Sequence, residues 1–398
     1  MRILFYGDFG CATGFAKVSQ NLVDRWIDKM GDKDELVILA LNNHEAEAYE
    51  YRDKAIVIPL LGTRDEKDKD HHCRNSFLRF LFSGEFEHIF LLNDLEVLSP
   101  LNKHITDIRK KHKENKKKFK IHVYYPVDSV PLKKHMQFLD IANHVYPYTE
   151  WGRKHTENYC DSRKIEVVSH GVEHDVFYPM DAVETIFPQD AYVFGSINRN
   201  SQRKDVATLL QAFSIVKKKL ENSNAPIILY LHMNPKDPFG LDIYEACEAL
   251  DLEIGKDVWL PENFNENEGF SPERLNELYN MFDFFVTTTT AEGWGLTITE
   301  AMACGTPVIA PIHTSITEIT DQGTLAYPLL DLRPFMFVND VQKVRYLSSP
   351  NETSKRMLDA LAEIDTEFQY DLIDKAIRWV AQYNWDDSAE IIYKNFKK

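Results

Sequence analysis

Short apolar runs alternate with longer amphipathic stretches along the first half of the chain. The runs have the length and the β-branched and aromatic content of buried strands, and they cover 2–6, 35–41, 55–61, 88–93, 120–125, 144–148 and 164–169. A helix-length pattern, FAKVSQNLVDRWIDKM at 15–30, follows the first run. This alternation predicts a parallel sheet with helices on both faces.

The second half repeats the alternation. Its expected strands cover 192–197, 226–233, 257–261, 282–288 and 307–311, and helical patterns such as 206–220 lie between them. A turn-rich stretch with Pro179 and Pro188 separates the halves. We therefore expect two α/β domains, 1–178 and 179–378, with a ligand-binding cleft at the strand ends. The segment 379–398, from two amphipathic C-terminal helices, is expected to pack back on the first domain.

Composition narrows the class of protein. With 398 residues, of which 44% are hydrophobic and 27% charged, the chain is long enough for two globular domains. It has no run of 18 apolar residues, so we expect no membrane span, and the apolar run at the amino terminus is too short for a signal peptide. The five cysteines are scattered, which fits a reducing compartment and argues against a disulfide frame or structural zinc. A cytoplasmic location follows as the expectation.

The charge balance disfavours nucleic acid as a partner. A formal net charge of −16 makes the chain a poor general binder of nucleic acid or anionic membrane. One local exception, RKKHKENKKKFK at 109–120, carries eight Lys or Arg against one Glu. Two interpretations stay open for this run: a solvated helix end with its loop, or a peripheral contact with a phosphate-bearing or membrane-bound acceptor.

A strand–turn–helix unit at 282–311 contains most of the candidate ligand-binding residues. Its turn reads EGWGLTITE at 292–300, and we expect the helix to begin near Leu296. Gly305 and Pro307 then end it in the usual way, with a C-terminal glycine followed by proline.

Ligand-binding groups are expected at the head of this helix. Gly293 and Gly295 let the backbone approach a ligand closely. Amides of the first helical turn suit a phosphate, and here they belong to Leu296, Thr297 and Ile298. Glu292 precedes the helix and Glu300 lies one turn inside it. The helix dipole alone accounts for Glu300 but not for Glu292 together with the glycines.

These residues carry a family resemblance. EGWGLTITEAMACGTPVI resembles the signature of glycosyltransferase family 4, whose members are retaining enzymes of the GT-B fold. The resemblance implies two Rossmann-like, doubly wound domains facing each other across a cleft. It implies that Glu300 binds the ribose hydroxyls of a nucleotide sugar and that Glu292 contacts the transferred sugar. It also implies that no metal or other cofactor is needed, and a virus-encoded member acting in a host cytoplasm is compatible with it.

A basic pair stands at the start of the second domain. In GSINRNSQRKDVATLLQAF (195–213), Arg199 and Lys204 match the family's pair on the donor diphosphate, where two cations can do what a metal ion does elsewhere. Arg203 is the alternative to Arg199. It ranks lower because its side chain and that of its neighbour Lys204 are expected to point in different directions.

Two segments of the first domain complete the expected site. The loop GDFGCATGF (7–15) lies between a strand and a helix, and by resemblance Gly10 and Gly14 would lie close to the donor phosphates, although tight turning alone also explains them. In YYPVDSVPL (124–132) the family's histidine is replaced by Val127. Asp128 remains a candidate for sugar or acceptor contact, or the head of a turn before Pro131.

The predicted function is retaining transfer of a hexose from a nucleotide diphosphate sugar to a hydroxyl of a glycan, lipid or protein-linked acceptor. Family frequency favours GDP-mannose as donor, with UDP-glucose next. A DNA-base glycosyltransferase and a non-catalytic nucleotide-sugar-binding protein are the alternatives. A homodimer is compatible with the sequence. The motif HGVEH, with His170, Glu173 and His174, could suggest zinc, but its turn context argues against a metal site.

Overall fold

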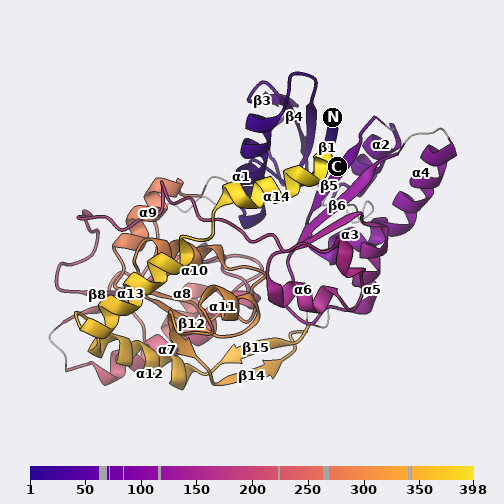
Figure 1. Ribbon diagram of the computed structural model, residues 1–398. Coiled ribbons are helices and arrows are strands. Elements are labelled where there is room, and N and C mark those ends of the chain that lie inside the picture. Colours follow the sequence, from indigo (N-terminus) through magenta and orange to yellow (C-terminus); the bar gives the residue numbers. More distant parts are fainter. Residues whose placement is uncertain are drawn as a thin grey trace. The chain divides into compact units, whose positions relative to one another are not determined.

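The computed structural model describes residues 1–61, 70, 72–83, 85–114, 118–222, 225–262, 269–338, 340 and 343–398. The chain divides into two compact units (Figure 1). Unit 1 comprises Met1–Gly171 and Trp385–Lys398, and unit 2 comprises Val172–Asn384. Each unit is described by itself.

A seven-stranded sheet forms the centre of unit 1. Its strand order is β3-β4-β2-β1-β5-β6-β7, and all neighbours are parallel except β3, which runs antiparallel to β4. The bounds are β1 Arg2–Asp8, β2 Glu35–Leu41, β3 Tyr49–Tyr51, β4 Ala55–Leu60, β5 His88–Leu92, β6 Lys120–Tyr125 and β7 His144–Pro147. The inner strands are buried on both faces, which explains their unbroken apolar runs. The order reverses beside β1, so the loop after β1 lies at the switch point of the sheet.

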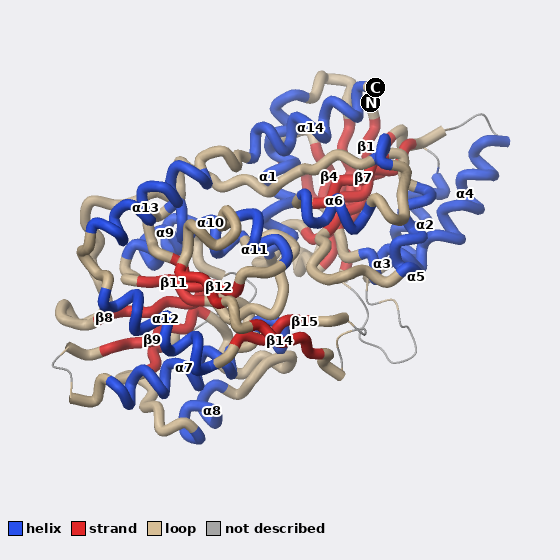
Figure 2. Tube along the Cα trace, turned by 60° about the horizontal axis from the view of Figure 1, so that its bottom comes forward, coloured by secondary structure: helices blue, strands red, loops and turns tan. Residues whose placement is uncertain are grey.

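Helices cover this sheet (Figure 2). They are α1 Gly14–Lys29, α2 Arg74–Ser83, α3 Leu95–Leu98, α4 Asn102–Glu114, α5 Lys133–Met136, α6 Glu150–Thr156 and α14 Trp385–Lys397. The C-terminal helix α14 packs against α1, where the Trp26 indole donates a hydrogen bond of 3.0 Å to the carbonyl of Ala389. Phe396 fills the space beside Trp26 and Phe90.

Unit 2 contains a six-stranded, wholly parallel sheet with the order β10-β9-β8-β11-β12-β13. Its strands are β8 Tyr192–Ile197, β9 Ile227–His232, β10 Val258–Trp259, β11 Phe284–Val286, β12 Val308–Pro311 and β13 Tyr327–Leu329. The helices are α7 Val206–Lys219, α8 Ile243–Ala249, α9 Pro272–Asn280, α10 Leu296–Ala303, α11 Thr314–Ile319, α12 Pro350–Ala362 and α13 Glu367–Val380. A separate antiparallel hairpin joins β14 Leu332–Phe335 to β15 Arg345–Ser348.

The unit boundaries differ from those expected. The chain leaves unit 1 after Gly171 rather than 178, because Val172 N–H bonds to the carbonyl of Tyr383 and Tyr178 N–H to Asn276 Oδ1, both in unit 2. It returns at Trp385 rather than 379, so α13 stays in unit 2 and α14 alone joins unit 1.

One predicted strand is wrong. The segment 164–169 contributes only an isolated bridge at Ile165, although the amides of Glu166 and Val168 donate to the carbonyls of β7. Its apolar content resembles a strand, but continuous ladder pairing is missing. Sequence analysis also missed β3, β13 and the β14–β15 hairpin.

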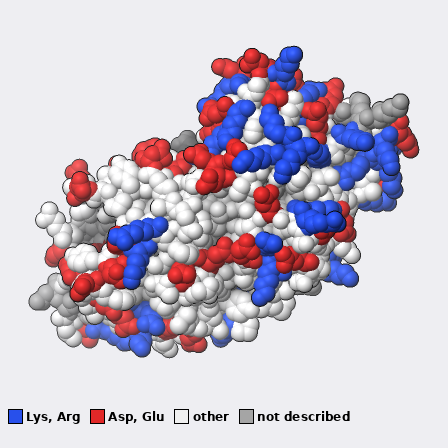
Figure 3. All heavy atoms as spheres, in the orientation of Figure 1, with Lys and Arg blue, Asp and Glu red and all other residues white. Residues whose placement is uncertain are grey.

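The basic run 109–120 lies partly on α4, and its residues 115–117 fall outside the described part of the chain. Figure 3 shows basic side chains gathered over the end of unit 1 that holds α4. Arg109 has a structural role, because its guanidinium donates hydrogen bonds to the carbonyl of Ile141 and to Asn143 Oδ1.

Candidate functional site

The head of α10 has the predicted form. The helix begins at Leu296, and Gly295 before it adopts φ +117°, a left-handed conformation that glycine adopts without strain. One expectation fails here: Ile298 N–H already donates to the carbonyl of Gly295 at 3.0 Å, inside the first turn. The amides of Leu296 and Thr297 therefore remain the candidates for an anion.

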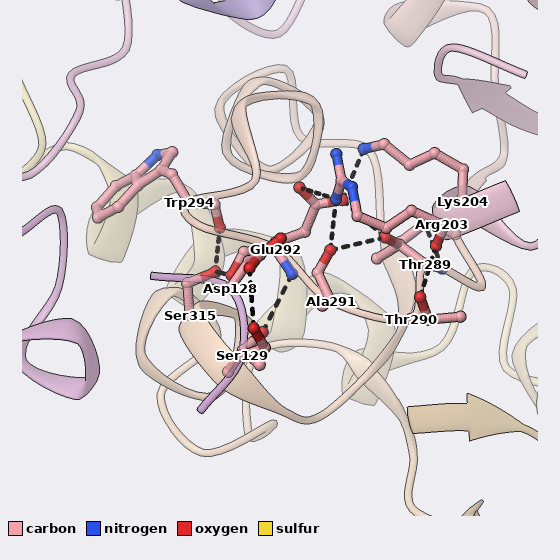
Figure 4. A network of polar contacts seen from close by, with 12 residues as sticks. Asp128, Ser129, Arg203, Lys204, Thr289, Thr290, Ala291, Glu292, Trp294 and Ser315 are labelled. Atoms are coloured by element: carbon pink, nitrogen blue, oxygen red, sulfur yellow. Dashed lines mark hydrogen bonds and ion pairs between the residues drawn. The ribbon is translucent and has the colours of Figure 1, made fainter. Parts of the chain in front are cut away.

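Glu292 sits in a dense polar network in the loop before α10 (Figure 4). Lys204 Nζ lies 2.6 Å from its Oε1 and Arg203 Nη1 3.0 Å from its Oε2. The hydroxyl of Thr289 donates to Oε1 at 2.8 Å. Each carboxylate oxygen therefore has a cationic partner.

Residues of α11 form hydrogen bonds with the backbone around Glu292. Its N–H donates to Thr314 Oγ1 at 3.1 Å, and the Ser315 hydroxyl donates to the carbonyls of Glu292 and Trp294 at 2.9 and 2.6 Å. Trp294 itself packs edge-on against Tyr383, with ring centroids 4.9 Å apart. These bonds fix the direction of the Glu292 side chain, and Trp294 has a packing role.

The electrostatics keep this carboxylate ionised. Burial alone would raise the pKa of Glu292, but the positive charges of Arg203 and Lys204 outweigh it and lower that pKa to about 2. Burial lowers the pKa of Lys204, against the attraction of Glu292. Burial also lowers the pKa of the nearby His313 to about 4, so this ring is neutral near pH 7.

The threonine cluster before Glu292 positions the two cations. Arg203 and Lys204 lie in a 3-10 turn, Gln202–Lys204, which precedes α7. The Thr290 hydroxyl donates to the carbonyl of Arg203, and the Thr288 hydroxyl donates to that of Asp205. The expectation that Arg203 and Lys204 point in different directions is wrong, because both side chains converge on the carboxylate that lies over this turn.

Arg199 lies in a different ion pair. Its Nε is 2.7 Å from Asp237 Oδ2, and its guanidinium lies 5.2 Å from the centre of the Phe239 ring. Asp237 is buried, whereas the Arg199 side chain is 61% exposed. The structure therefore unites Lys204 with Glu292 and Arg203, and it holds Arg199 in a separate pair with Asp237.

Glu300 is buried in the first turns of α10. The hydroxyl of Tyr279, on α9, donates to Glu300 Oε2 at 2.9 Å. One carboxylate oxygen is thus oriented by the protein. Tyr279 was not singled out from the sequence, because nothing local in the sequence marks a partner 21 positions away.

In unit 1 the loop after β1 is a compact turn. Gly10 has φ +67°, and a Cβ there would lie 2.7 Å from Asn43 Nδ2, so any other residue would be strained at this position. Gly14 is the first residue of α1, directly after the cap Thr13, whose hydroxyl donates to Asp8 at 2.8 Å. Burial raises the pKa of the Asp8 carboxyl. Sequence analysis missed Asp8 and Thr13, although their positions at a strand end and a helix cap could have indicated them.

Asp128 follows β6 in unit 1, and the hydroxyl of Ser129 donates to its Oδ1 at 3.3 Å. The HGVEH stretch shows other contacts. The ring of His170 packs against Tyr148 and Trp385, and that of His174 bonds to the carbonyl of Tyr383. Over the described ranges, no three His, Cys, Asp or Glu side chains are grouped so that they could hold a metal ion, and no helix is long and apolar enough to cross a membrane.

Part of the chain matches a known sequence family. Residues 189–333 match the sequence model of the family described as Glycosyl transferases group 1. A D-inositol 3-phosphate glycosyltransferase of Mycobacteroides abscessus is 24% identical over 244 residues, which is 60% of this chain and 47% of that protein. The chain thus spans about half the length of this curated relative.

Solved structures show the fold. Sucrose-phosphate synthase from Thermosynechococcus elongatus superposes with a TM-score of 0.74 at 15% identity, over 100% of this chain and 98% of that one. The Anabaena protein HepE, in complex with UDP and glucose, gives a TM-score of 0.66 at 14% identity, over 100% and 99%. The predicted GT-B fold class, α/β with two Rossmann-like domains, is confirmed.

Proposed function

We propose that this chain, whose residues 189–333 belong to the group 1 glycosyl transferases, moves a hexose from a nucleotide diphosphate sugar to an acceptor hydroxyl with retention at the anomeric carbon. One observation carries the proposal. At the head of α10, a buried and ionised Glu292 lies within 3.0 Å of two cations, beside a glycine turn and helix-start amides.

In the proposed reaction the bond from the anomeric carbon to the diphosphate oxygen breaks while the acceptor oxygen attacks from the same face. The leaving phosphate oxygen takes the acceptor's proton, so the step needs no enzyme nucleophile. The sugar carries positive character in between, which the ionised Glu292 stabilises. Charge-assisted hydrogen bonds of this kind contribute roughly 1.5–3 kcal/mol each.

The cations act on the leaving group. The departing diphosphate gains negative charge, and Lys204, together with Arg199 or Arg203, stabilises it beside the amides of Leu296 and Thr297. A unit charge pair at about 4 Å contributes about 4 kcal/mol at an effective dielectric of 20. That corresponds to roughly a thousandfold in rate where the contact is made at the transition state. Catalysis without a metal ion is part of this proposal.

The donor and the acceptor are finer parts of the proposal. Family frequency favours GDP-mannose, whereas UDP and glucose are bound to the similar structure HepE, so a UDP-hexose is the stronger candidate donor. The name of the mycobacterial relative gives a phosphorylated polyol as its acceptor. We propose a sugar or polyol hydroxyl as the acceptor here, with Glu300 on the donor ribose.

The test is calorimetric titration of the full chain with UDP-glucose, GDP-mannose, UDP-N-acetylglucosamine and ADP-glucose, each with and without EDTA. One nucleotide sugar that binds equally in EDTA, and is consumed when an acceptor is added, supports the proposal. Binding without turnover for every acceptor would favour a non-catalytic nucleotide-sugar-binding protein. No binding by any of the four would overturn the assignment of the donor site.

A further inference from the structure

A cavity lies within unit 2, beside the network of Glu292. Its volume is about 510 Å³, which is within the range of small-molecule sites. One wall is the start of α7, with Asp205, Thr208 and Gln211. The opposite wall is the β14–β15 hairpin and the start of α12.

The hairpin presents one face to this cavity. Its lining residues on and around β14 are alternate positions of the chain, Asp331, Arg333, Phe335 and Phe337, which share a face of an extended strand. Phe335 remains 42% exposed, and its ring lies 5.1 Å from that of Phe337. The two rings meet edge to face, at an interplanar angle of 67°, so Phe335 can offer a single apolar ring face to a guest.

Polar atoms in the wall lack partners. Among the described residues, neither Asp205 Oδ2 nor Ser348 Oγ has a hydrogen-bond partner, although both atoms are buried and both residues line the cavity. Ser348 is 3% exposed. Burial raises the pKa of Asp205 to about 6. Buried polar groups normally have partners, so these two oxygens are exceptions in this wall.

The charges select the class of ligand. The lining holds two carboxylates, Asp205 and Asp331, and one cation, Arg333, so its formal charge is −1 when all three are ionised. That balance disfavours a phosphate or nucleotide. A neutral saccharide fits, because it has hydroxyls for the carboxylates and the amide of Gln211 and an apolar ring face for Phe335.

We propose that this cavity is a saccharide-binding subsite, separate from the donor site. Its walls are joined to that site: the Thr288 hydroxyl donates to the carbonyl of Asp205, directly after Lys204, and Tyr346 N–H on β15 donates to the carbonyl of Thr290. The role of the bound saccharide as acceptor or product rests on the proposed function, whereas saccharide binding itself does not.

The test is saturation-transfer NMR on the full chain with maltose, lactose and α-1,2-mannobiose as probes, each in the presence of saturating UDP. We expect at least one disaccharide to bind with a millimolar Kd, and Phe335→Ala to weaken it by roughly fivefold to tenfold, as loss of an aromatic contact does. Gln211→Ala should weaken it as well. Phe368→Ala, which removes an exposed ring on α13 outside the cavity, is the matched control and should leave binding unchanged.

Several outcomes would overturn the subsite: no binding by any of the three disaccharides, binding that persists in both Phe335→Ala and Gln211→Ala, or binding that Phe368→Ala reduces equally. Loss of UDP affinity in Phe335→Ala would assign the cavity to the nucleotide instead. UDP titration of the wild-type chain reports the donor site separately. Failure of the subsite and failure of the proposed function are therefore distinguishable.

Discussion

Lys204 Nζ lies 2.6 Å from Glu292 Oε1, and both side chains are shielded from solvent, at 13% and 9% exposed. Arg203 holds the other carboxylate oxygen. The residues proposed to act on the sugar and on the diphosphate thus form one ion pair. A diphosphate that binds Lys204 has to share this cation with Glu292.

Glu292→Gln separates the two roles. We expect turnover of the donor to fall by about 100-fold or more, because the variant loses the negative charge next to the anomeric carbon. Affinity for UDP should stay within threefold or increase, because Lys204 and Arg203 lose their competing counter-ion. Initial rates and calorimetry measure the two effects.

The control for this variant is Glu273→Gln, on the exposed start of α9, which should match the wild type in both assays. Unchanged turnover in Glu292→Gln would remove Glu292 from the catalytic site. Loss of UDP binding together with activity would mean that the carboxylate holds the loop rather than the sugar.

The basic residues can be ranked by alanine substitution. We expect Lys204→Ala to lower kcat by roughly a thousandfold, and Arg199→Ala to cause a large loss with the fold intact. Arg203→Ala should cost about tenfold, because Lys204 still neutralises Glu292. Circular dichroism checks the fold, and steady-state kinetics measure the rate.

Arg153→Ala, which removes an exposed ion pair with Glu157 on α6, is the control for these variants. Wild-type rates in Arg199→Ala with a large loss in Arg203→Ala would transfer the diphosphate role to Arg203.

Local patterns account for what the sequence predicted. Glycine chemistry fixes the start of α10 at Leu296, and short, largely apolar runs mark β2, β6 and β8 at their observed bounds. The β14 strand was not predicted from the sequence, because it is four residues long and contains Pro334. A proline is typical of an edge strand or a loop.

Such local patterns could not predict contacts between residues that are distant in sequence. Lys204 meets Glu292 across 88 positions and Arg199 meets Asp237 across 38, so only the folded chain shows which cation faces which acid. Propensity and periodicity describe single elements, whereas these pairs depend on how the loops after β8, β9 and β11 lie at one edge of the sheet of unit 2.

A histidine cluster should make unit 1 sensitive to acid. His88 Nδ1 lies 3.0 Å from His122 Nε2, and the ring of His144 stacks on that of His122 at 4.7 Å. Burial, with the charge of Lys120, lowers the pKa of His88 to about 4, and the pKa values of His122 and His144 are also lowered. Below pH 6.5 the unfolded chain binds more protons than the folded one, so stability falls as the pH falls from 6.5 towards 4.

Calorimetric unfolding at pH 7 and pH 5 measures this effect. We expect the Tm of unit 1 to drop by roughly 3 °C or more, and His122→Phe to show a smaller drop whatever its stability at pH 7. His104→Gln, on the exposed face of α4, should keep the wild-type drop. Equal drops in the wild type and His122→Phe would locate the acid sensitivity elsewhere.

The packing of α14 gives the last prediction. Phe396 is 3% exposed and lies with its ring 5.1 Å from Trp26 and 4.8 Å from His122, so Phe396→Ala leaves a cavity between the helix and the sheet. The expected cost is about 3–5 kcal/mol, seen as earlier unfolding of unit 1 in urea. Phe368→Ala, on α13 in unit 2 and 56% exposed, should change stability by no more than about 0.5 kcal/mol. If both variants unfold like the wild type, α14 contributes little to unit 1, and the indole–carbonyl bond from Trp26 to Ala389 does not anchor it.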